Sequence, residues 1–300
     1  ATTLPNPPGE PQNFAASAVE ANTLTLSWSA PTTGGAVGNY ELALPVPPFT
    51  VTQTGTTYNV TGLAPGTNYN FQVRAQNDGG ISNFVSTPAL TKPGAPTGLA
   101  AGSIVQTTLT LNWNSPGGVV SEYEVDQAPA ISGPWTTLAS NVGTTSYGVT
   151  GLTANTTYFF RVRAKNATGL SANSIEASAT TLPNPPAAPT GLAITTPVTS
   201  TNQLALTWTD NADNEVSYEV ERSENGGGFT AIATGLAANL TSYTATGLSA
   251  NTLYAFRVRA RNTGGESGYS TSSSLLTLPD APGGLSATVR ELLLAAEHVR

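Results

Sequence analysis

The sequence contains no cysteine, no methionine and a single histidine among its 300 residues. Without cysteine, the chain can form neither a disulfide nor a thiolate-bound zinc or iron–sulfur site. The histidine, His298, lies in an atypical C-terminal tail, so no imidazole is available inside a folded domain for a Ser-His-Asp site or a histidine-clustered metal site. Thiol chemistry is therefore excluded, nucleophilic catalysis of the triad type nearly so, and we expect no cofactor.

Charge is scarce as well. Charged residues make up 10% of the chain, and the formal net charge is -7. No run of Lys and Arg occurs, although nucleic acids and anionic membranes both attract clustered basic side chains. No stretch of about 18 apolar residues occurs either, which a membrane-spanning helix needs. We therefore expect no nucleic-acid partner and no membrane insertion. A cysteine-free chain rich in Thr, Asn and Gly is typical of exported bacterial or archaeal proteins, which favours an extracellular or cell-surface location.

One phrase of fourteen residues occurs three times in the chain. It reads GLAPGTNYNFQVRA at 62–75, GLTANTTYFFRVRA at 151–164 and GLSANTLYAFRVRA at 247–260. Each copy follows a lone tryptophan; the three are Trp28, Trp113 and Trp208. A repeat of about 90 residues indicates tandem copies of one folded unit. One unit copied along a chain is more often a scaffold than a catalyst, so we expect no enzymatic activity.

Apolar and polar residues alternate within each unit. In the second unit, Leu109, Leu111 and Trp113 share one face of a predicted strand. The repeated phrase alternates in the same way, and its inward residues in this unit are Tyr158, Phe160, Val162 and Ala164. Period-2 alternation broken by Gly, Pro and Asn clusters is typical of short antiparallel strands. About seven such strands in some 90 residues predict an all-β, two-sheet sandwich.

The units resemble fibronectin type III domains over roughly residues 8–278. The opening Ala-Pro-Thr-Gly-Leu at 95–99 and 188–192 is similar to the first strand of that family. The three tryptophans match its core tryptophan, and three tyrosines match its tyrosine corner: Tyr69, Tyr158 and Tyr254. The resemblance implies three seven-stranded, immunoglobulin-like sandwiches, in which each corner hydroxyl bonds back to the backbone.

The resemblance also divides the chain into segments. We expect a linker tail at 1–8, domains at 9–91, 94–182 and 187–278, and a further linker with an atypical tail at 279–300. Residues 1–8 are identical to residues 179–186, which link two units. Proline-rich linkers should act as semi-rigid spacers. In the first domain, the proline-rich stretch 44–49 predicts the absence of a regular strand.

Carboxylates offer two candidate sites. Asp210, Asp213 and Glu215 crowd one loop and could supply a weak calcium site, although a solvated turn is favoured because calcium takes six or more oxygen ligands. Two glutamate pairs lie two residues apart on predicted strands, at 122/124 and 219/221. A glycosidase can use such a pair. In the strand order that the resemblance implies, arginines at 161/163 and 257/259 should lie beside these pairs, which favours cross-strand ion pairs of about 0.2–1 kcal/mol each.

Exposed aromatic rings could stack on sugars. Trp135 is the strongest candidate, and Phe159 points outward by parity. Phe49 and Phe229 fall at nearly the same place in their own units, which favours a structural position for Trp135 instead.

The C-terminal tail does not continue the strand pattern. Thr288 and Glu291 form a capping-box pattern, which predicts a helix. Its apolar stripe offers an assembly contact and comprises Val289, Leu292, Leu293, Ala296 and Val299. A helix this short is marginal by itself. It would dock on the third domain or on another molecule, and a sequencing artefact is the alternative.

Together these patterns predict a non-catalytic array that acts as a spacer, stalk or assembly module of an extracellular or cell-surface protein, including a subunit of a fibre. The alternative is a carbohydrate-binding accessory or linker region of a secreted polysaccharide-degrading enzyme. The expected partners are other domains of the same larger chain, copies of the chain itself, or polysaccharide.

Overall fold

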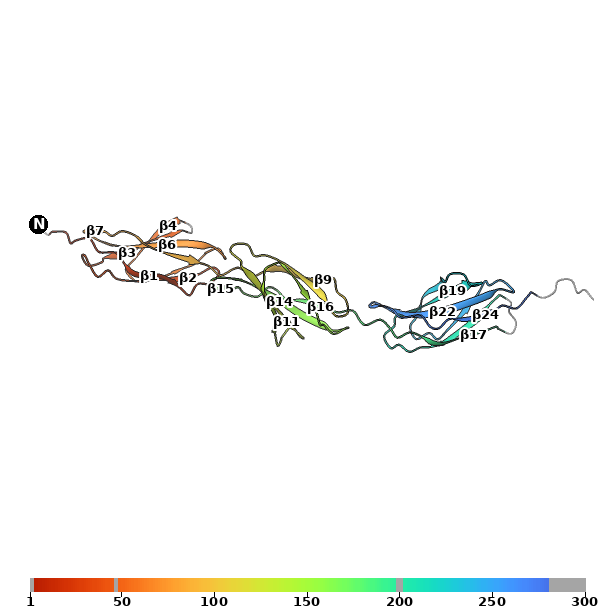
Figure 1. Ribbon diagram of the computed structural model, residues 1–300. Helices are drawn as coiled ribbons and strands as arrows, with labels where there is room; N and C mark the ends of the chain where they lie inside the picture. The colour runs from red at the N-terminus through yellow and green to blue at the C-terminus, as the bar shows by residue number, and fades with distance from the viewer. Residues whose placement is uncertain (1–2, 46–47, 198–201, 281–300) are drawn as a thin grey trace, which may run out of the picture. The chain divides into compact units, whose positions relative to one another are not determined.

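The computed structural model describes residues 3–45, 48–197 and 202–280, and every regular element in these ranges is a β-strand (Figure 1). The strands form six sheets, which pair into three sandwiches. Within the same ranges, nothing helical is present that could serve as a membrane span.

The first domain shows the architecture. Its strands are β1 (Gln12–Ser17), β2 (Leu24–Ser29), β3 (Asn39–Pro45), β4 (Pro48–Gln53), β5 (Thr57–Val60), β6 (Asn68–Asn77), β7 (Gly80–Ile81) and β8 (Val85–Leu90). One sheet has the order β1-β2-β5, and the other has the order β4-β3-β6-β7 with β8 also on β6. Because β7 and β8 both pair with β6, they are two pieces of one last strand, so the domain has the seven-stranded form.

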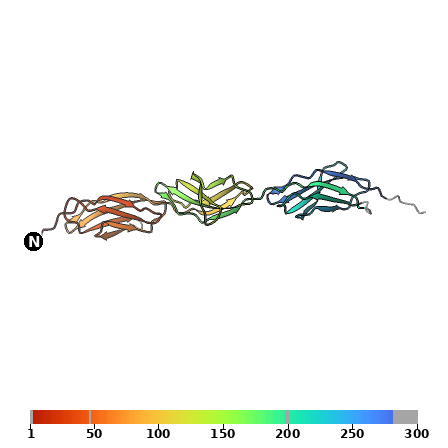
Figure 2. The ribbon, with the colours of Figure 1, turned by 90° about the horizontal axis from the view of Figure 1, so that it is seen from below.

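The other two domains repeat this order. The second has β9 (Thr97–Gly102), β10 (Leu109–Asn114), β11 (Glu122–Ala128), β12 (Thr136–Val142), β13 (Ser146–Val149), β14 (Thr157–Asn166), β15 (Gly169–Leu170) and β16 (Ala177–Thr180). The third has β17 (Thr190–Thr195), β18 (Leu204–Thr209), β19 (Ser217–Glu224), β20 (Thr230–Ala237), β21 (Ser242–Ala245), β22 (Leu253–Asn262), β23 (Gly265–Glu266) and β24 (Ser273–Leu276). Seen from below, each domain again shows its strands in two layers (Figure 2).

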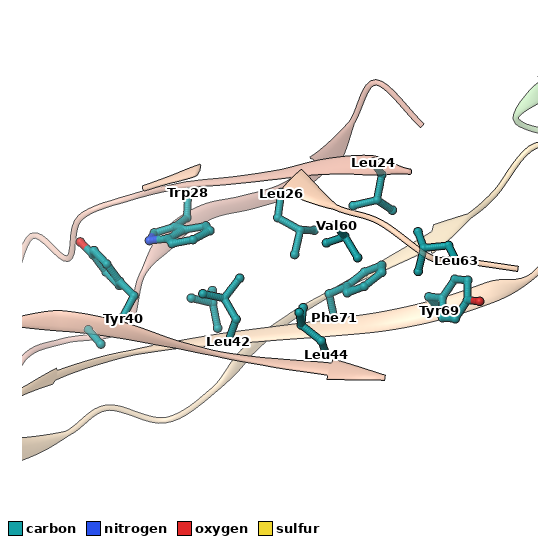
Figure 3. Close-up of a cluster of buried hydrophobic side chains, with 12 residues drawn as sticks. Leu24, Leu26, Trp28, Tyr40, Leu42, Leu44, Val60, Leu63, Tyr69 and Phe71 are labelled. Carbon is teal, nitrogen blue, oxygen red and sulfur yellow. The ribbon is translucent and has the colours of Figure 1, made fainter. Parts of the chain in front are cut away.

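The core of each domain lies between its two sheets because alternate residues of each strand point inward. In the first domain, Leu24, Leu26 and Trp28 of β2 face Leu42 of β3 and Phe71 of β6 (Figure 3). Leu26, Leu42 and Phe71 are fully buried. The equivalent tryptophans of the other domains, Trp113 and Trp208, are 4% and 5% exposed.

The proline-rich stretch of the first domain departs from the sequence-based expectation, which was wrong. Strand β3 continues to Pro45 and β4 starts at Pro48, and these two residues are partners in the register. Strand β4 is an edge strand, paired only with β3. Proline is tolerated at strand ends and on edges, where no ladder hydrogen bond requires its missing N–H.

The tyrosine of each repeated phrase ties down the loop before it. The hydroxyl of Tyr69 accepts a hydrogen bond from the Ala64 amide at 2.8 Å. Tyr158 accepts one from the Thr153 amide at 2.9 Å, and Tyr254 accepts one from the Ser249 amide at 3.0 Å. These bonds fix the loop through which the chain passes from one sheet to the other.

A buried threonine closes each domain after its last strand. The Thr91 hydroxyl accepts from the Thr67 amide at 2.9 Å and donates to the Ala64 carbonyl at 2.8 Å. Thr181 and Thr277 make the same pair of bonds in the second and third domains. The first two domains fall in one compact unit, which ends at Thr181, and the third falls in another, which begins at Leu182.

Candidate interaction surface

The outer face of the larger sheet in the third domain carries a ladder of charges. Glu219 lies opposite Arg259, and Glu221 lies opposite Arg257, in the register of β19 and β22. The Arg259 Nη2 to Glu219 Oε1 distance is 2.8 Å, and the Arg257 Nη2 to Glu221 Oε2 distance is 2.5 Å. Glu266 of β23 pairs with Arg259 as well. The carboxylates that the sequence offered as a catalytic pair are therefore occupied by arginines.

Aromatic rings cover these arginines. The Arg257 guanidinium lies 4.3 Å from the ring centre of Phe229 and 3.7 Å from that of Tyr269, so it sits between two rings. The Tyr269 hydroxyl donates to Glu221 Oε1 at 2.5 Å. Burial alone would raise the pKa of Glu221, but the hydrogen bonds from Tyr269 and Arg257 outweigh it and hold this pKa below its usual value.

The same face of the second domain has a ladder of three rungs. Asp126 Oδ2 accepts from Arg161 Nε at 2.9 Å, Glu124 pairs with Arg163, and Glu122 Oε1 accepts from Lys165 Nζ at 2.6 Å. Glu122 therefore lies opposite Lys165 and not opposite an arginine, which corrects the sequence-based expectation. The Trp135 ring centre lies 4.3 Å from the Arg161 guanidinium, and the ring is partly exposed. Phe159, two residues from Arg161 on β14, is also partly exposed and lies opposite Ala128 and Ser178 in the register.

An aromatic ring rests on an arginine in all three domains. Trp135 over Arg161 in the second domain corresponds to Phe229 over Arg257 in the third. In the first domain, Arg74 pairs with Glu41 at 2.6 Å, and its guanidinium lies 4.5 Å from the Phe84 ring centre. This recurrence describes a structural feature of the sheet face, and all three rings are partly exposed.

The acidic loop of the third domain binds its own backbone. Asp210 Oδ1 accepts from the Ala212 amide at 3.0 Å, while Asp213 is exposed. Glu215 is 8% exposed and accepts through Oε1 from the Asn239 amide at 3.0 Å. Over residues 3–45, 48–197 and 202–280, no three acidic or histidine side chains gather in a way that could hold a metal ion.

One difference from the sequence-based expectation concerns this loop, because Glu215 is buried, whereas a solvated turn was favoured. Burial, together with the neighbouring Asp210, raises the pKa of the Tyr218 hydroxyl, which lies beneath the same loop. The tail candidates Leu292, Leu293, Ala296 and Val299 lie outside the described residues, as does His298.

An asparagine that was not predicted from the sequence holds the segment entering each domain. The side-chain amide of Asn77 donates to the Asn6 carbonyl at 2.9 Å, and that of Asn262 donates to the Asn184 carbonyl at 2.8 Å. In the second domain, Asn166 donates to the Thr91 carbonyl at 2.8 Å. The signal was present, because each asparagine occupies the same place just after the repeated phrase.

Glycines let the entering segment approach this turn. A Cβ on Gly79 would lie 1.8 Å from the Pro5 carbonyl oxygen, and one on Gly264 would lie 1.7 Å from the Pro183 carbonyl oxygen. No side chain fits at such distances. The sequences Asn-Asp-Gly-Gly and Asn-Thr-Gly-Gly at these turns are therefore matched to the identical linker that enters both domains.

Comparisons with known proteins agree with this architecture. The family model of the fibronectin type III domain matches residues 9–92, 94–180 and 187–275. The chain is 38% identical to exoglucanase A of Cellulomonas fimi over 281 residues, which are 86% of this chain and 31% of that one. It is 35% identical to exoglucanase B of the same organism over 231 residues, which are 70% of this chain and 20% of that one.

A third relative is chitinase A1 of Niallia circulans, which is 34% identical over 181 residues. That match covers 56% of this chain and 24% of the chitinase. The chain thus spans less than a third of the length of any of these three relatives.

Proposed function

Because the chain belongs to the fibronectin type III domain family, we propose that it is a non-catalytic spacer that separates other parts of a longer extracellular chain. The observation that carries this proposal is the tandem architecture itself. Each of the three domains has its own core, and each entering segment is held by a side-chain amide of the domain that follows. Separately folded domains whose linkers are held by hydrogen bonds would keep the flanking parts of a longer chain apart.

The chemistry of the surface supports the same role. The paired carboxylates of the outer sheet faces are bound by arginines or, at Glu122, by Lys165, at 3.0 Å or less, and in the third domain Tyr269 occupies a further oxygen. A general acid or nucleophile needs a carboxyl group that substrate can reach. Relatives that are exoglucanases and a chitinase match this chain over less than a third of their own length, which suits an accessory segment of a larger chain.

The spacer proposal is tested by inserting the full chain between a cellulase catalytic domain and a cellulose-binding domain. We expect faster hydrolysis of insoluble cellulose than with a direct fusion of the two, and equal hydrolysis of a soluble substrate. The chain alone should hydrolyse neither cellulose nor chitin and should sediment as a monomer. Hydrolysis by the chain alone, or equal rates with and without the insert, would contradict the proposal, and concentration-dependent association would favour a fibre subunit.

A second candidate function is contact with polysaccharide at the exposed side of Trp135. It is favoured by the stacking of this ring on Arg161, which fixes the orientation of the indole, and by the names of the relatives. Phe159 lies on the same strand as Arg161 and would extend the contact. Aromatic rings with one free face bind sugars through apolar contact and C–H groups.

This second candidate is tested by retention of the full chain on insoluble cellulose and chitin. We expect Trp135→Ala to reduce retention several-fold, and Phe159→Ala to reduce it less. The matched control is Phe229→Ala, which removes the corresponding ring from Arg257 in the third domain. Equal retention of all three variants and the unchanged chain, or no retention of any of them, would rule out the platform.

A further inference from the structure

We propose that the first and second domains are coupled by a stiff, hydrogen-bonded joint and move as one body. The joint consists of Gly66, Leu90 and Thr91 on the side of the first domain, and of Val119, Asn166 and Thr168 on the side of the second. This inference goes beyond the spacer role, because it concerns the mechanics of one linkage and holds whatever flanks the chain.

Three hydrogen bonds cross the joint. The Val119 amide donates to the Gly66 carbonyl at 2.6 Å. The Asn166 side-chain amide donates to the Thr91 carbonyl at 2.8 Å, and the Thr168 hydroxyl donates to the Leu90 carbonyl at 2.6 Å. The acceptors lie in two separate segments of the first domain, so the bonds resist rotation as well as separation.

Thr91 links the two domains through one residue. It is fully buried, and its hydroxyl is bonded to the Thr67 amide and the Ala64 carbonyl of the first domain. Its carbonyl accepts from Asn166 of the second domain, which is itself 3% exposed. Because the hydroxyl and the carbonyl of one residue are held by different domains, only the Cα–C bond of the backbone lies between the two anchoring points.

The joint is further fastened through Lys92. The Gly66 amide donates to the Lys92 carbonyl at 2.8 Å, so Gly66 is bonded through its amide to the linker and through its carbonyl to the second domain. The Lys92 ammonium pairs with Glu20 at 2.8 Å. The first residue of the linker is therefore bound to the first domain through its carbonyl and its ammonium group.

The entering segments of the first and third domains are built differently. There, the asparagine amide binds Asn6 and Asn184, each three residues after the threonine at positions 3 and 181. In the second domain it binds Thr91 itself. From Thr91 to Leu99 the chain advances eight residues, whereas from Thr181 to Leu192 it advances eleven. With the shorter linker, the carbonyl of Thr91, the closing threonine of the first domain, lies within hydrogen-bond distance of the Asn166 side chain.

The turn residue distinguishes the two kinds of entry. Gly79 and Gly264 occupy the turn position that Thr168 occupies in the second domain. At both glycines, the absence of a side chain lets a proline carbonyl of the entering segment approach the turn. With the shorter linker, a threonine fits and supplies a hydroxyl to Leu90. Linker length and turn residue therefore specify the joint together.

A pair of neighbouring glycines provides a matched test. A Cβ on Gly118 would lie 2.7 Å from the Gly66 carbonyl oxygen and 2.8 Å from that of Pro65, both in the first domain. A Cβ on Gly117 would meet nothing within 4 Å. Both glycines have positive φ, at +79° for Gly117 and +68° for Gly118. Gly118→Ala and Gly117→Ala thus share the backbone strain, and only Gly118→Ala pushes against the joint.

The experiment measures the distance between the two domains in the full chain. Since the sequence has no cysteine, Ser86→Cys on β8 and Ser178→Cys on β16, both exposed, accept spin labels without side reactions. Pulsed electron paramagnetic resonance should give one narrow distance distribution for the labelled chain and for its Gly117→Ala variant. Gly118→Ala should broaden the distribution at least about twofold while circular dichroism stays unchanged.

Hydrogen exchange gives a second readout at the joint itself. We expect Gly118→Ala to speed exchange of the Gly66 and Val119 amides more than about tenfold, and Gly117→Ala to change it less than about twofold. A broad distribution in the labelled chain without either glycine substitution would overturn the stiff joint. Equal effects of the two glycine variants would overturn the role of the Gly118 contact.

Discussion

At the scale of single residues, the outer faces of the larger sheets are stabilised by carboxylates that are nearly buried and held from several sides. Glu221 accepts from Arg257 and Tyr269, and Arg257 is in turn held between two rings. A buried ion pair stabilises a fold only when hydrogen bonds replace the lost hydration of both charges. These contacts meet that condition, so the network is sensitive to protonation and to the loss of one member.

Acid should weaken the third domain through Glu221. Its pKa is lowered in the folded state, so its contribution to stability is present above the unfolded value of 4.5 and is lost as the pH falls through the folded value. We expect Glu221→Gln to lower the urea midpoint at neutral pH and to flatten its dependence between about pH 5 and pH 3. Because the chain has four tryptophans, the midpoint of this domain is followed by hydrogen exchange of peptides from β19 and β22 and not by fluorescence. The control is Glu224→Gln, an exposed position on the same strand, and an equally steep acid dependence in Glu221→Gln would contradict the prediction.

The tyrosine corner should contribute measurably to each domain. Tyr254→Phe removes the acceptor of the Ser249 amide and leaves the ring in place. We expect a loss of about 1 kcal/mol in the free energy of unfolding of the third domain, since a net hydrogen bond contributes about 0.5–1.5 kcal/mol. Urea denaturation measures the loss. Tyr243→Phe, on a strand of the opposite sheet, should cost less than about 0.5 kcal/mol, and a similar cost for both would contradict the assignment.

At the scale of elements, the strands follow from alternation, whereas the segments between them follow from contacts with distant parts of the chain. The turn after β22 is an example, because Asn262 bonds to Asn184, 78 residues earlier. Its side chain also accepts from the Gly264 amide at 2.8 Å, so one residue shapes the turn and holds the entering segment. A change in this turn should therefore act on the linker.

Gly264→Ala should release the segment that enters the third domain. The new Cβ would overlap the Pro183 carbonyl, so the segment must move away from Asn262. We expect large chemical-shift changes of the Asn184 and Ala187 backbone resonances, with a loss of only about 1 kcal/mol in the stability of the domain. Nuclear magnetic resonance spectra of the full chain measure the change. At Gly268 a Cβ would lie 3.9 Å from its nearest neighbour, so small shifts at these two residues are expected for Gly268→Ala. Equal shifts in the two variants would show that the close approach does not hold the segment.

At the scale of the whole molecule, each domain encloses a separate core. The three clusters of buried residues share no member. A domain with its own core can in principle fold and unfold alone. Coupling between domains must then come from specific contacts such as those made by Thr91 and Asn166.

A cavity in the third core should leave the first domain unaffected. Leu206 is fully buried, and Leu206→Ala should lower the stability of the third domain by about 2–5 kcal/mol. Hydrogen exchange resolved by peptide should show loss of protection in β18 and β22 and none in β2 and β6. The converse variant, Leu42→Ala, should remove protection from the first domain and not from the third. Loss of protection in all three domains from Leu206→Ala would contradict separate cores.

The sequence by itself determined the number of domains, the strand pattern and the family, because repetition and period-2 alternation are local properties that each strand carries alone. The corner tyrosines were identifiable for the same reason, since the hydroxyl of each reaches an amide only five residues away. The strand order of the resembled family also predicted arginines opposite the carboxylates, which is confirmed for Glu124, Glu219 and Glu221, whereas Glu122 lies opposite Lys165.

Only the tertiary structure decided which contacts join distant parts of the chain. The proline-rich stretch of the first domain forms strands because its partner β3 accepts an edge strand with prolines at its end. Glu215 is buried because Asn239, 24 residues away, supplies an amide donor. The side chains of Asn77, Asn166 and Asn262 each donate to a carbonyl that lies 71 to 78 residues earlier in the chain. Linker length and turn shape together determine which carbonyl that is. Local sequence patterns span only a few residues and cannot predict contacts over such separations. The joint between the first two domains could therefore be identified only from the folded structure.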